Sequence, residues 1–174
     1  MVDFSDKRPN PDDILEDLFI NEQNKKGRLE IFLGYAAGVG KTYAMLDDAH
    51  EQMKCGVDVL VGYIEEHTRP ETIQLMSGLP TLPPKFVAYR NIQLKEFDLD
   101  AALERKPDLI LVDELAHTNA PGVRNKKRYQ DIEELLNAGI DVFTTVNIQH
   151  LESLNDIVQN ITKISVHETV PDYV

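Results

Sequence analysis

The sequence predicts an α/β fold with a mostly parallel sheet and helices on both faces. Apolar runs typical of strands alternate with helical segments from residue 29 onward, which is the pattern of crossover units in a parallel sheet. A glycine-rich segment that ends in Lys41 and Thr42 lies between one such run and a helix. A second apolar run ends in Asp113 and Glu114, at the strand end where open α/β sheets bind ligands.

The length of the chain favours one domain. It has 174 residues, of which 42% are apolar, enough for one compact core. Residues 1–27 are expected to form an N-terminal helical extension and linker. Its helix would begin after Asn10, because Pro11 and the acids behind it favour helix initiation. Residues 28–174 would form the domain itself.

The charge and the apolar pattern exclude several classes of protein. Eighteen basic against thirty acidic residues give a net charge of −12, which argues against nucleic acid as a partner. The single cysteine, Cys55, cannot form an intramolecular disulfide. The sequence shows no basic and apolar leader and no window that approaches about 18 consecutive apolar residues. We therefore expect a cytoplasmic domain without membrane contact of its own.

The expected strands are short apolar runs bounded by glycine, proline or acids. The run at 29–33 is typical of a buried strand that ends at Gly34, and the run at 109–112 is typical of a central parallel strand. The runs at 86–89 and 92–94 can pair as the arms of a small hairpin. The full set of expected strands is 29–33, 57–63, 86–89, 92–94, 109–112, 141–146 and 161–166.

The expected helices carry start and stop signals. Gly56, Gly78 and Gly139 follow three of them, at the position where a glycine commonly ends a helix. Asp98 is placed to cap another helix. The full set of expected helices in the domain is 41–54, 71–77, 98–104, 129–137 and 151–159.

A phosphate-binding loop is predicted between the first strand and the first helix of the domain. Its residues are Gly38, Val39, Gly40, Lys41 and Thr42. The glycines let backbone N–H groups point into one concavity, and the helix adds its positive N-terminal end. Lys41 would reach the phosphates of ATP, and the Thr42 hydroxyl would ligate Mg²⁺. The sequence thus predicts a P-loop NTPase-like domain that binds ATP with Mg²⁺, although Tyr35 replaces the first glycine of the usual pattern and Gly34 stands one place too early.

The acids that follow residues 109–112 are the second part of the predicted nucleotide site. We expect this strand to lie beside the strand that precedes the phosphate loop. Asp113 would then orient the Mg²⁺ shell opposite Thr42. Glu114 is the candidate catalytic residue, since it could polarise an attacking water if ATP is hydrolysed.

Three further segments are predicted at the same edge of the sheet, at residues 65–69, 117–119 and 147–150. They form either a γ-phosphate sensor or second-substrate pocket, or only solvated loops and helix caps. The spacing of their three histidines matches no zinc site, so we expect no structural zinc. These histidines are His67, His117 and His150.

Residues 124–128 place four positive charges in five positions of an acidic chain. Such a run is usually a solvated loop before a helix, and we favour that interpretation. The alternative is a docking patch for phosphate or for an acidic partner surface.

Four segments together resemble the N-terminal cytoplasmic domain of the KdpD family, the bacterial sensor histidine kinases for potassium limitation and osmotic stress. They are residues 8–12 (RPNPD), 34–42 (GYAAGVGKT), 112–122 (VDELAHTNAPG) and 144–156 (TTVNIQHLESLND). The resemblance covers nearly the whole chain. It implies an ATP-binding regulatory domain of a two-component system, which would set the balance between kinase and phosphatase activity.

The resemblance also implies what surrounds this domain. In the family a stress-protein-like module, membrane helices and a kinase core follow it, so the partners would be these downstream domains and, indirectly, a response regulator. The parent would be a membrane protein with this domain on the cytoplasmic side. The family domain continues past Val174, so residues 28–174 would be a P-loop nucleotide-binding regulatory domain that is truncated at its C-terminus. It lacks the kinase core and would at most hydrolyse ATP slowly.

The residues alone leave two other activities open and disfavour two more. A P-loop kinase of a small substrate, similar to thymidine kinases, stays open and would need a base such as Glu66 or His117. A stand-alone ATPase also stays open. GTPases are disfavoured because residues 147–150 do not supply the Asn-Lys-x-Asp segment that reads guanine. Partitioning-type ATPases are disfavoured because Ala36 stands where that class has a second lysine.

Overall fold

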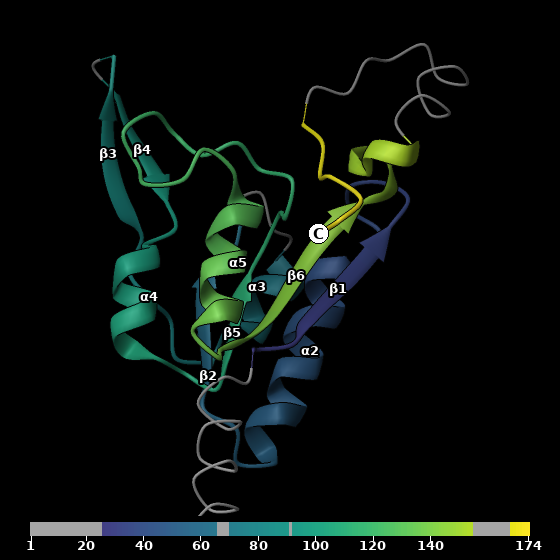
Figure 1. Cartoon of the computed structure of the whole chain (residues 1–174). Helices are drawn as coiled ribbons and strands as arrows, with labels where there is room; N and C mark the ends of the chain where they lie inside the picture. The colour runs from purple at the N-terminus through teal and green to yellow at the C-terminus, as the bar shows by residue number, and fades with distance from the viewer. Residues whose placement is uncertain (1–25, 66–69, 91, 155–167) are drawn as a thin grey trace, which may run out of the picture.

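The computed structural model describes residues 26–65, 70–90, 92–154 and 168–174, and its main sheet has four parallel strands (Figure 1). In sheet order they are β1 (Leu29–Gly34), β6 (Asp141–Asn147), β5 (Leu109–Val112) and β2 (Val59–Tyr63). β1 pairs with β6 over its whole length, up to Gly34 opposite Asn147. This register sets the loop after β1 beside the residues that follow β6.

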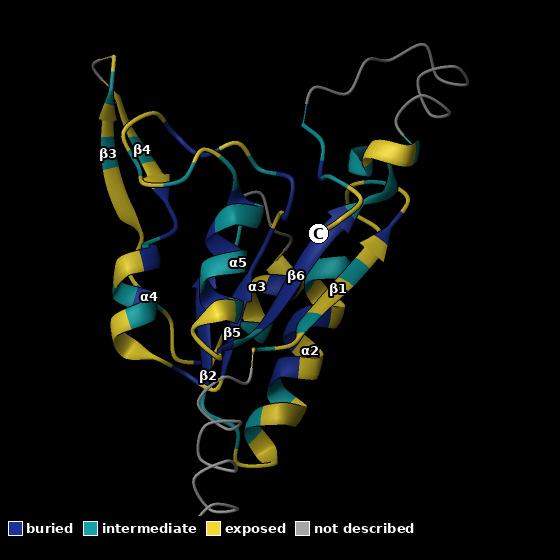
Figure 2. Ribbon diagram, in the orientation of Figure 1, coloured by how far each residue is buried: buried dark blue, intermediate teal, exposed yellow. Residues whose placement is uncertain are grey.

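Helices cover both faces of this sheet. They are α2 (Lys41–Lys54), α3 (Pro70–Leu75), α4 (Leu99–Arg105) and α5 (Arg128–Asn137). Successive residues of a strand point to opposite faces: Leu109 and Leu111 join the buried residues of α2, whereas Ile110 and Val112 join those of α4 and α5. β6 is almost wholly dark blue in Figure 2, as a central strand buried on both sides should be. The predicted α/β architecture is confirmed.

A separate antiparallel hairpin consists of β3 (Lys85–Tyr89) and β4 (Ile92–Glu96). It confirms the expectation that these two runs pair. In Figure 1 the hairpin projects beyond α4, away from the main sheet. Most of its residues are exposed, but Glu96 at the end of β4 is buried.

The expectation that β5 lies beside β1 is wrong. β6 stands between them, because it pairs with β5 through Leu109 opposite Asp141 and with β1 on its other side. The crossover through α5 therefore places β6 in the position next to β1. The Asp113 end of β5 is thus one strand further from the loop than expected.

The expectation that residues 29–33 form a buried strand is also wrong. β1 is an edge strand of the described sheet, with β6 as its one neighbour there. Ile31 is 38% exposed and Leu33 is 56% exposed. An apolar run carries no sign of whether it will lie at the centre or at the edge of a sheet.

The predicted helix boundaries agree closely where the structure describes them. The helix expected at 41–54 is α2, and the expected cap of α4 is present, since the Asp98 carboxylate accepts a hydrogen bond from the Ala101 N–H at 3.3 Å. The helix expected after Asn10, the strand expected at 161–166 and most of the helix expected at 151–159 lie outside the described residues. Among the described residues, no helix has the length and apolar character needed to cross a bilayer.

Candidate functional site

The loop between β1 and α2 turns on glycines. Gly38 and Gly40 have φ angles of 78° and 96°, which an L side chain adopts only with strain. Gly40 is the N-cap of α2, so the free N–H groups of the first helical turn face the end of this loop. The loop therefore has the backbone of an anion-binding turn.

Lys41 lies folded over this loop. Its Nζ donates to the Ala36 carbonyl at 3.0 Å and to Oδ1 of Asn147 at 2.6 Å. The stem of Lys41 passes directly over Gly34, where an added Cβ would lie 2.7 Å from the Lys41 Cδ. Gly34 is thus the position that leaves room for the lysine, one place earlier than the usual pattern has its glycine.

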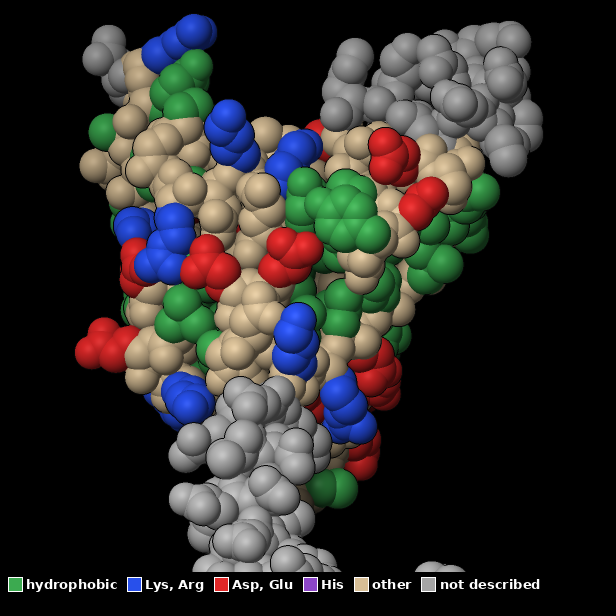
Figure 3. All heavy atoms as spheres, viewed as in Figure 1, with side chains coloured by type: hydrophobic (Ala, Val, Ile, Leu, Met, Phe, Trp, Pro, Cys, Tyr) green, Lys and Arg blue, Asp and Glu red, His purple; other side chains and the backbone are tan. Residues whose placement is uncertain are grey.

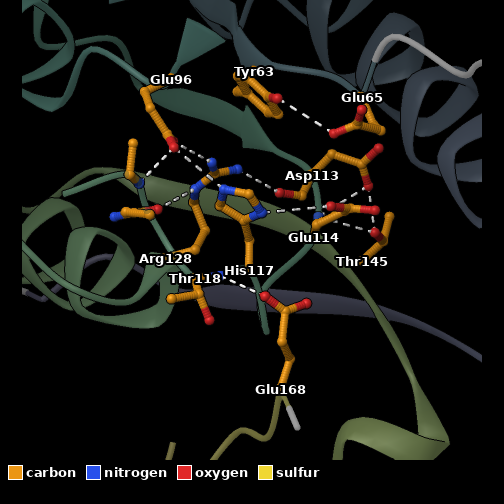
Figure 4. A network of polar contacts seen from close by, with 12 residues as sticks. Tyr63, Glu65, Glu96, Asp113, Glu114, His117, Thr118, Arg128, Thr145 and Glu168 are labelled. Atoms are coloured by element: carbon orange, nitrogen blue, oxygen red, sulfur yellow. Dashed lines mark hydrogen bonds and ion pairs between the residues drawn. The ribbon is translucent and has the colours of Figure 1, made fainter. Parts of the chain in front are cut away.

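Asp113 follows β5, and its carboxylate is buried between the loop and β6. Its Oδ2 accepts a hydrogen bond from the Thr42 hydroxyl at 3.3 Å. Its Oδ1 accepts hydrogen bonds from the Thr145 hydroxyl and from the Glu114 N–H, the latter at 3.1 Å. Figure 4 shows both contacts ending on the same carboxylate oxygen. Thr42 and Asp113 are therefore in contact although β6 lies between β1, which precedes Thr42, and β5, which precedes Asp113.

Glu114 has a left-handed backbone with φ of 60°, which is uncommon for a residue other than glycine. Its N–H donates to the Thr145 hydroxyl at 3.2 Å, and its Oε2 lies 3.9 Å from Nδ1 of His117. Burial, followed by the negative charges of Glu65 and Asp113, raises the pKa of Glu114 above its ordinary value. A carboxylate with a raised pKa is a stronger base than a free one.

These residues line one pocket of about 580 Å³, a volume typical of small-molecule sites. It brings together all the loop and strand-end residues of the predicted nucleotide site, namely Gly38, Val39, Gly40, Lys41, Thr42, Asp113 and Glu114. Tyr35 is 74% exposed and does not line the pocket. The tyrosine in the glycine-rich pattern therefore points away from the concavity.

Each of the other three strand-end segments contributes at least one residue to the pocket. Glu65, His117, Asn147 and His150 line the pocket beside the acids. The expected segment 65–69 is described only at Glu65. All three segments suggested for a sensor or for a second substrate thus meet at one place.

The preferred interpretation of residues 124–128, a solvated loop, is wrong for Arg128, which is 0% exposed. Its guanidinium lies 4.4 Å from the centre of the Tyr63 ring and pairs with Glu96 at 3.2 Å. Arg124 on the surface pairs with Asp100 and Glu134. The run is therefore mostly used for contacts within the chain. On the face of the molecule drawn in Figure 3, lysines and arginines are scattered.

The sequence did not single out two contributions to the site: Thr145 donates to Asp113 from β6, and Arg128 supports the peptide after Asp113. Asn147, which holds the Lys41 amine, belongs to the predicted segment 147–150. Thr145 had one signal in the sequence, since it lies near the carboxyl end of an expected strand. Arg128 had none, because a run of positive charges is normally solvated.

Comparisons with known proteins identify the family of this chain. The profile of the family described as "KdpD: Osmosensitive K+ channel His kinase sensor domain" matches residues 25–174. "Sensor protein KdpD" of Clostridium acetobutylicum is 59% identical over 174 residues, which cover 99% of this chain and 19% of that protein. The protein of the same name from Escherichia coli K12 is 58% identical over 165 residues, 95% of this chain and 18% of that protein. The one from Mycobacterium tuberculosis H37Rv is 53% identical over 148 residues, 85% of this chain and 17% of that protein. The chain thus spans less than a fifth of the length of these relatives.

Proposed function

Because the chain belongs to the KdpD sensor-domain family, we propose that it is an ATP-binding regulatory domain of a two-component sensor histidine kinase that responds to potassium limitation and osmotic stress. The sensor part of this proposal rests on the names of the family and of the relatives. The nucleotide part rests on the pocket at the carboxyl ends of β1, β5 and β6.

One observation carries the nucleotide part: Lys41 and the contact between Thr42 and Asp113 lie at the same glycine turn. A lysine over a glycine turn at the N-terminus of a helix suits the β and γ phosphates, which need positive charge and close backbone approach. A hydroxyl beside a carboxylate supplies the hard oxygen ligands that Mg²⁺ prefers. The space above Gly34 is filled by the side chains of Lys41 and Val39, so a residue with a Cβ at this position would displace the lysine.

The proposed roles of the residues follow from this fit. Gly38, Gly40 and Lys41 would hold the phosphates, and Thr42 and Asp113 would hold Mg²⁺. The bound metal would neutralise phosphate charge. Glu114 would polarise a water in slow hydrolysis, which its raised pKa favours.

The proposal includes the parent protein. Residues 28–174 would act as a nucleotide-binding unit on the cytoplasmic side of a larger membrane protein. The relatives from Clostridium acetobutylicum and Escherichia coli are more than five times longer than this chain. Downstream domains of that protein would transfer a phosphoryl group to a response regulator. Nucleotide binding to residues 28–174 would regulate those domains.

A second candidate is a kinase of a small substrate. The pocket extends beyond Asp113 to Glu65, Glu114 and His117, where an acceptor hydroxyl would find a base. ADP production that depends on an added acceptor would favour this function. Nucleotide binding without such turnover would favour the regulatory domain.

Isothermal titration with a slowly hydrolysed ATP analogue and Mg²⁺ tests the proposal. We expect saturable binding that is selective over GTP and that weakens about 10- to 100-fold in Lys41→Ala, because each hydrogen bond from a charged group is worth about 1.5–3 kcal/mol. Lys54→Ala is the matched control, since Lys54 is exposed at the other end of α2 and pairs with Glu51. No heat and no thermal stabilisation at millimolar nucleotide would refute nucleotide binding by this chain.

A further inference from the structure

Arg128 is the first residue of α5 and is fully buried behind the end of β5. Its Nη1 donates to the Asp113 carbonyl at 3.0 Å, and its Nε lies 3.4 Å from Oδ1 of Asn119. Figure 4 shows the guanidinium between Asp113 and Glu96, next to the Tyr63 ring. The planar guanidinium is thus fixed by stacking and by hydrogen bonds in several directions.

Glu96 is the counterion of Arg128 and comes from the hairpin. It is 4% exposed, and its Oε2 accepts from Arg128 Nη2 at 3.2 Å. Its Oε1 accepts from the Ala120 N–H at 2.6 Å and lies 3.5 Å from Nε2 of His117. The pair therefore ties the last residue of β4 to the loop that follows β5.

The carbonyl that Arg128 holds belongs to the peptide between Asp113 and Glu114. The N–H of the same peptide donates to Asp113 Oδ1 and to Thr145 Oγ1. Glu114 keeps a left-handed backbone only if its surroundings hold it there. Arg128 fixes one side of this peptide and Thr145 fixes the other.

We propose that Arg128 and Glu96 are positioning residues that hold the Asp113–Glu114 peptide, so that Asp113 faces Thr42 and Glu114 faces the pocket. This inference rests on the proposed function, because it assigns the pair to the Mg²⁺ side of the nucleotide site. Neither residue lines the pocket. Both act through the backbone of the peptide.

If the ion pair had a purely structural role, replacing it with uncharged side chains would change stability but not the position of the Asp113–Glu114 peptide. A buried ion pair often adds little to stability compared with apolar residues of similar size, whereas a lone buried charge is costly. Arg128→Met alone leaves the buried Glu96 charge without its arginine partner, so it changes both position and stability. The double variant Glu96→Gln with Arg128→Met removes both charges, so it separates a loss of position from a loss of fold.

Amide hydrogen exchange measured by NMR is the first readout. In the double variant we expect fast exchange of the Glu114 and Leu115 amides, while the amides of β5 and β6 keep their protection. Arg128→Lys should show the same effect, because an ammonium cannot copy the fork of a guanidinium. Arg124→Met is the matched control from the same run of charges and should leave both sets unchanged. Wild-type protection of Glu114 in a folded double variant would overturn the proposal.

The ratio of nucleotide affinities with and without Mg²⁺ is the second readout. Loss of a residue that orients a metal ligand costs about 10- to 100-fold in metal-dependent binding, so the ratio should fall by about tenfold or more in the double variant and stay at the wild-type value in Arg124→Met. An unchanged ratio in the folded double variant would also overturn the proposal. If the wild-type chain binds no nucleotide, the proposed function fails, and the exchange of the Glu114 amide still decides whether the pair positions this peptide.

Discussion

Hydrogen bonds within the chain orient the Asp113 carboxylate without any ligand. The Thr145 hydroxyl and the Glu114 N–H occupy one carboxylate oxygen, and the Thr42 hydroxyl contacts the other. Hydrogen bonds to a carboxylate are strong and directional. One oxygen is therefore anchored to β6 and its own loop, and the other faces α2, which is the side where the proposed metal would lie.

Thr145→Val tests this anchor. We expect the free energy of unfolding to fall by about 1–3 kcal/mol, because Asp113 loses a donor and the Glu114 N–H loses an acceptor in a buried place. Mg²⁺-dependent nucleotide affinity should fall about tenfold. Urea unfolding and calorimetric titration measure the two effects.

Thr144→Val is the control for that substitution. Thr144 is also buried in β6, but its hydroxyl has no hydrogen-bond partner in the part of the chain that the structure describes. Loss of this hydroxyl should leave stability unchanged or raise it by up to about 1 kcal/mol. Equal losses in the two variants would mean that the hydroxyl of Thr145 has no special role.

Single residues could be predicted from the sequence where the pattern is local. Lys41 and Thr42 follow a glycine turn, and Asp113 follows an apolar strand, so these local patterns were enough to predict that the three residues lie together in one pocket. Arg128 could not, because its burial depends on an acid from a hairpin distant in the sequence. Thr145 could not be singled out either, because its neighbour has the same side chain and the opposite direction.

At the scale of elements, the strand β6 joins the two halves of the site. It pairs with β1 on one side and with β5 on the other. It delivers Thr145 to Asp113 and Asn147 to Lys41. The strand and helix positions could be predicted from hydrophobic periodicity, but the place of β6 could not, since strand order depends on which crossovers skip a neighbour.

Gly27→Ala tests how closely the chain before β1 packs on the start of β6. The Gly27 N–H donates to the Leu136 carbonyl at 2.8 Å, and an added Cβ would lie 1.9 Å from the Ile140 carbonyl oxygen. Because the obstacle is backbone, we expect a loss of about 3 kcal/mol in the free energy of unfolding. Urea unfolding measures it, with the exposed neighbour Lys26→Ala as the control. A loss below about 1 kcal/mol would show that the backbone at Gly27 and Ile140 can move apart at little cost.

At the scale of the whole molecule, the pH dependence of stability combines acids whose pKa values are shifted in opposite directions. Burial raises the pKa of Asp131 and of Glu114. For Glu96, burial also acts to raise the pKa, but hydrogen bonds from His117 and the Ala120 N–H and the charge of Arg128 outweigh it and lower the pKa below the ordinary 4.5. The total pH dependence of a chain with a net charge of −12 therefore cannot identify any one group.

The difference between the wild-type chain and Glu96→Gln isolates that one group, because the other acids are common to both proteins. A carboxylate whose pKa is lower in the folded state releases its proton more readily there, so its stabilising contribution is complete above about pH 4.5 and is lost as the pH falls through the folded pKa. At about pH 7 we expect Glu96→Gln to be less stable by about 3 kcal/mol, since Arg128 stays buried without a counterion. Urea unfolding in steps down to about pH 3.5 should show this gap becoming smaller, because the protonated wild-type side chain then resembles glutamine. A gap that stays constant or widens in acid would mean that Glu96 is not held in its charged form by Arg128 and its neighbours.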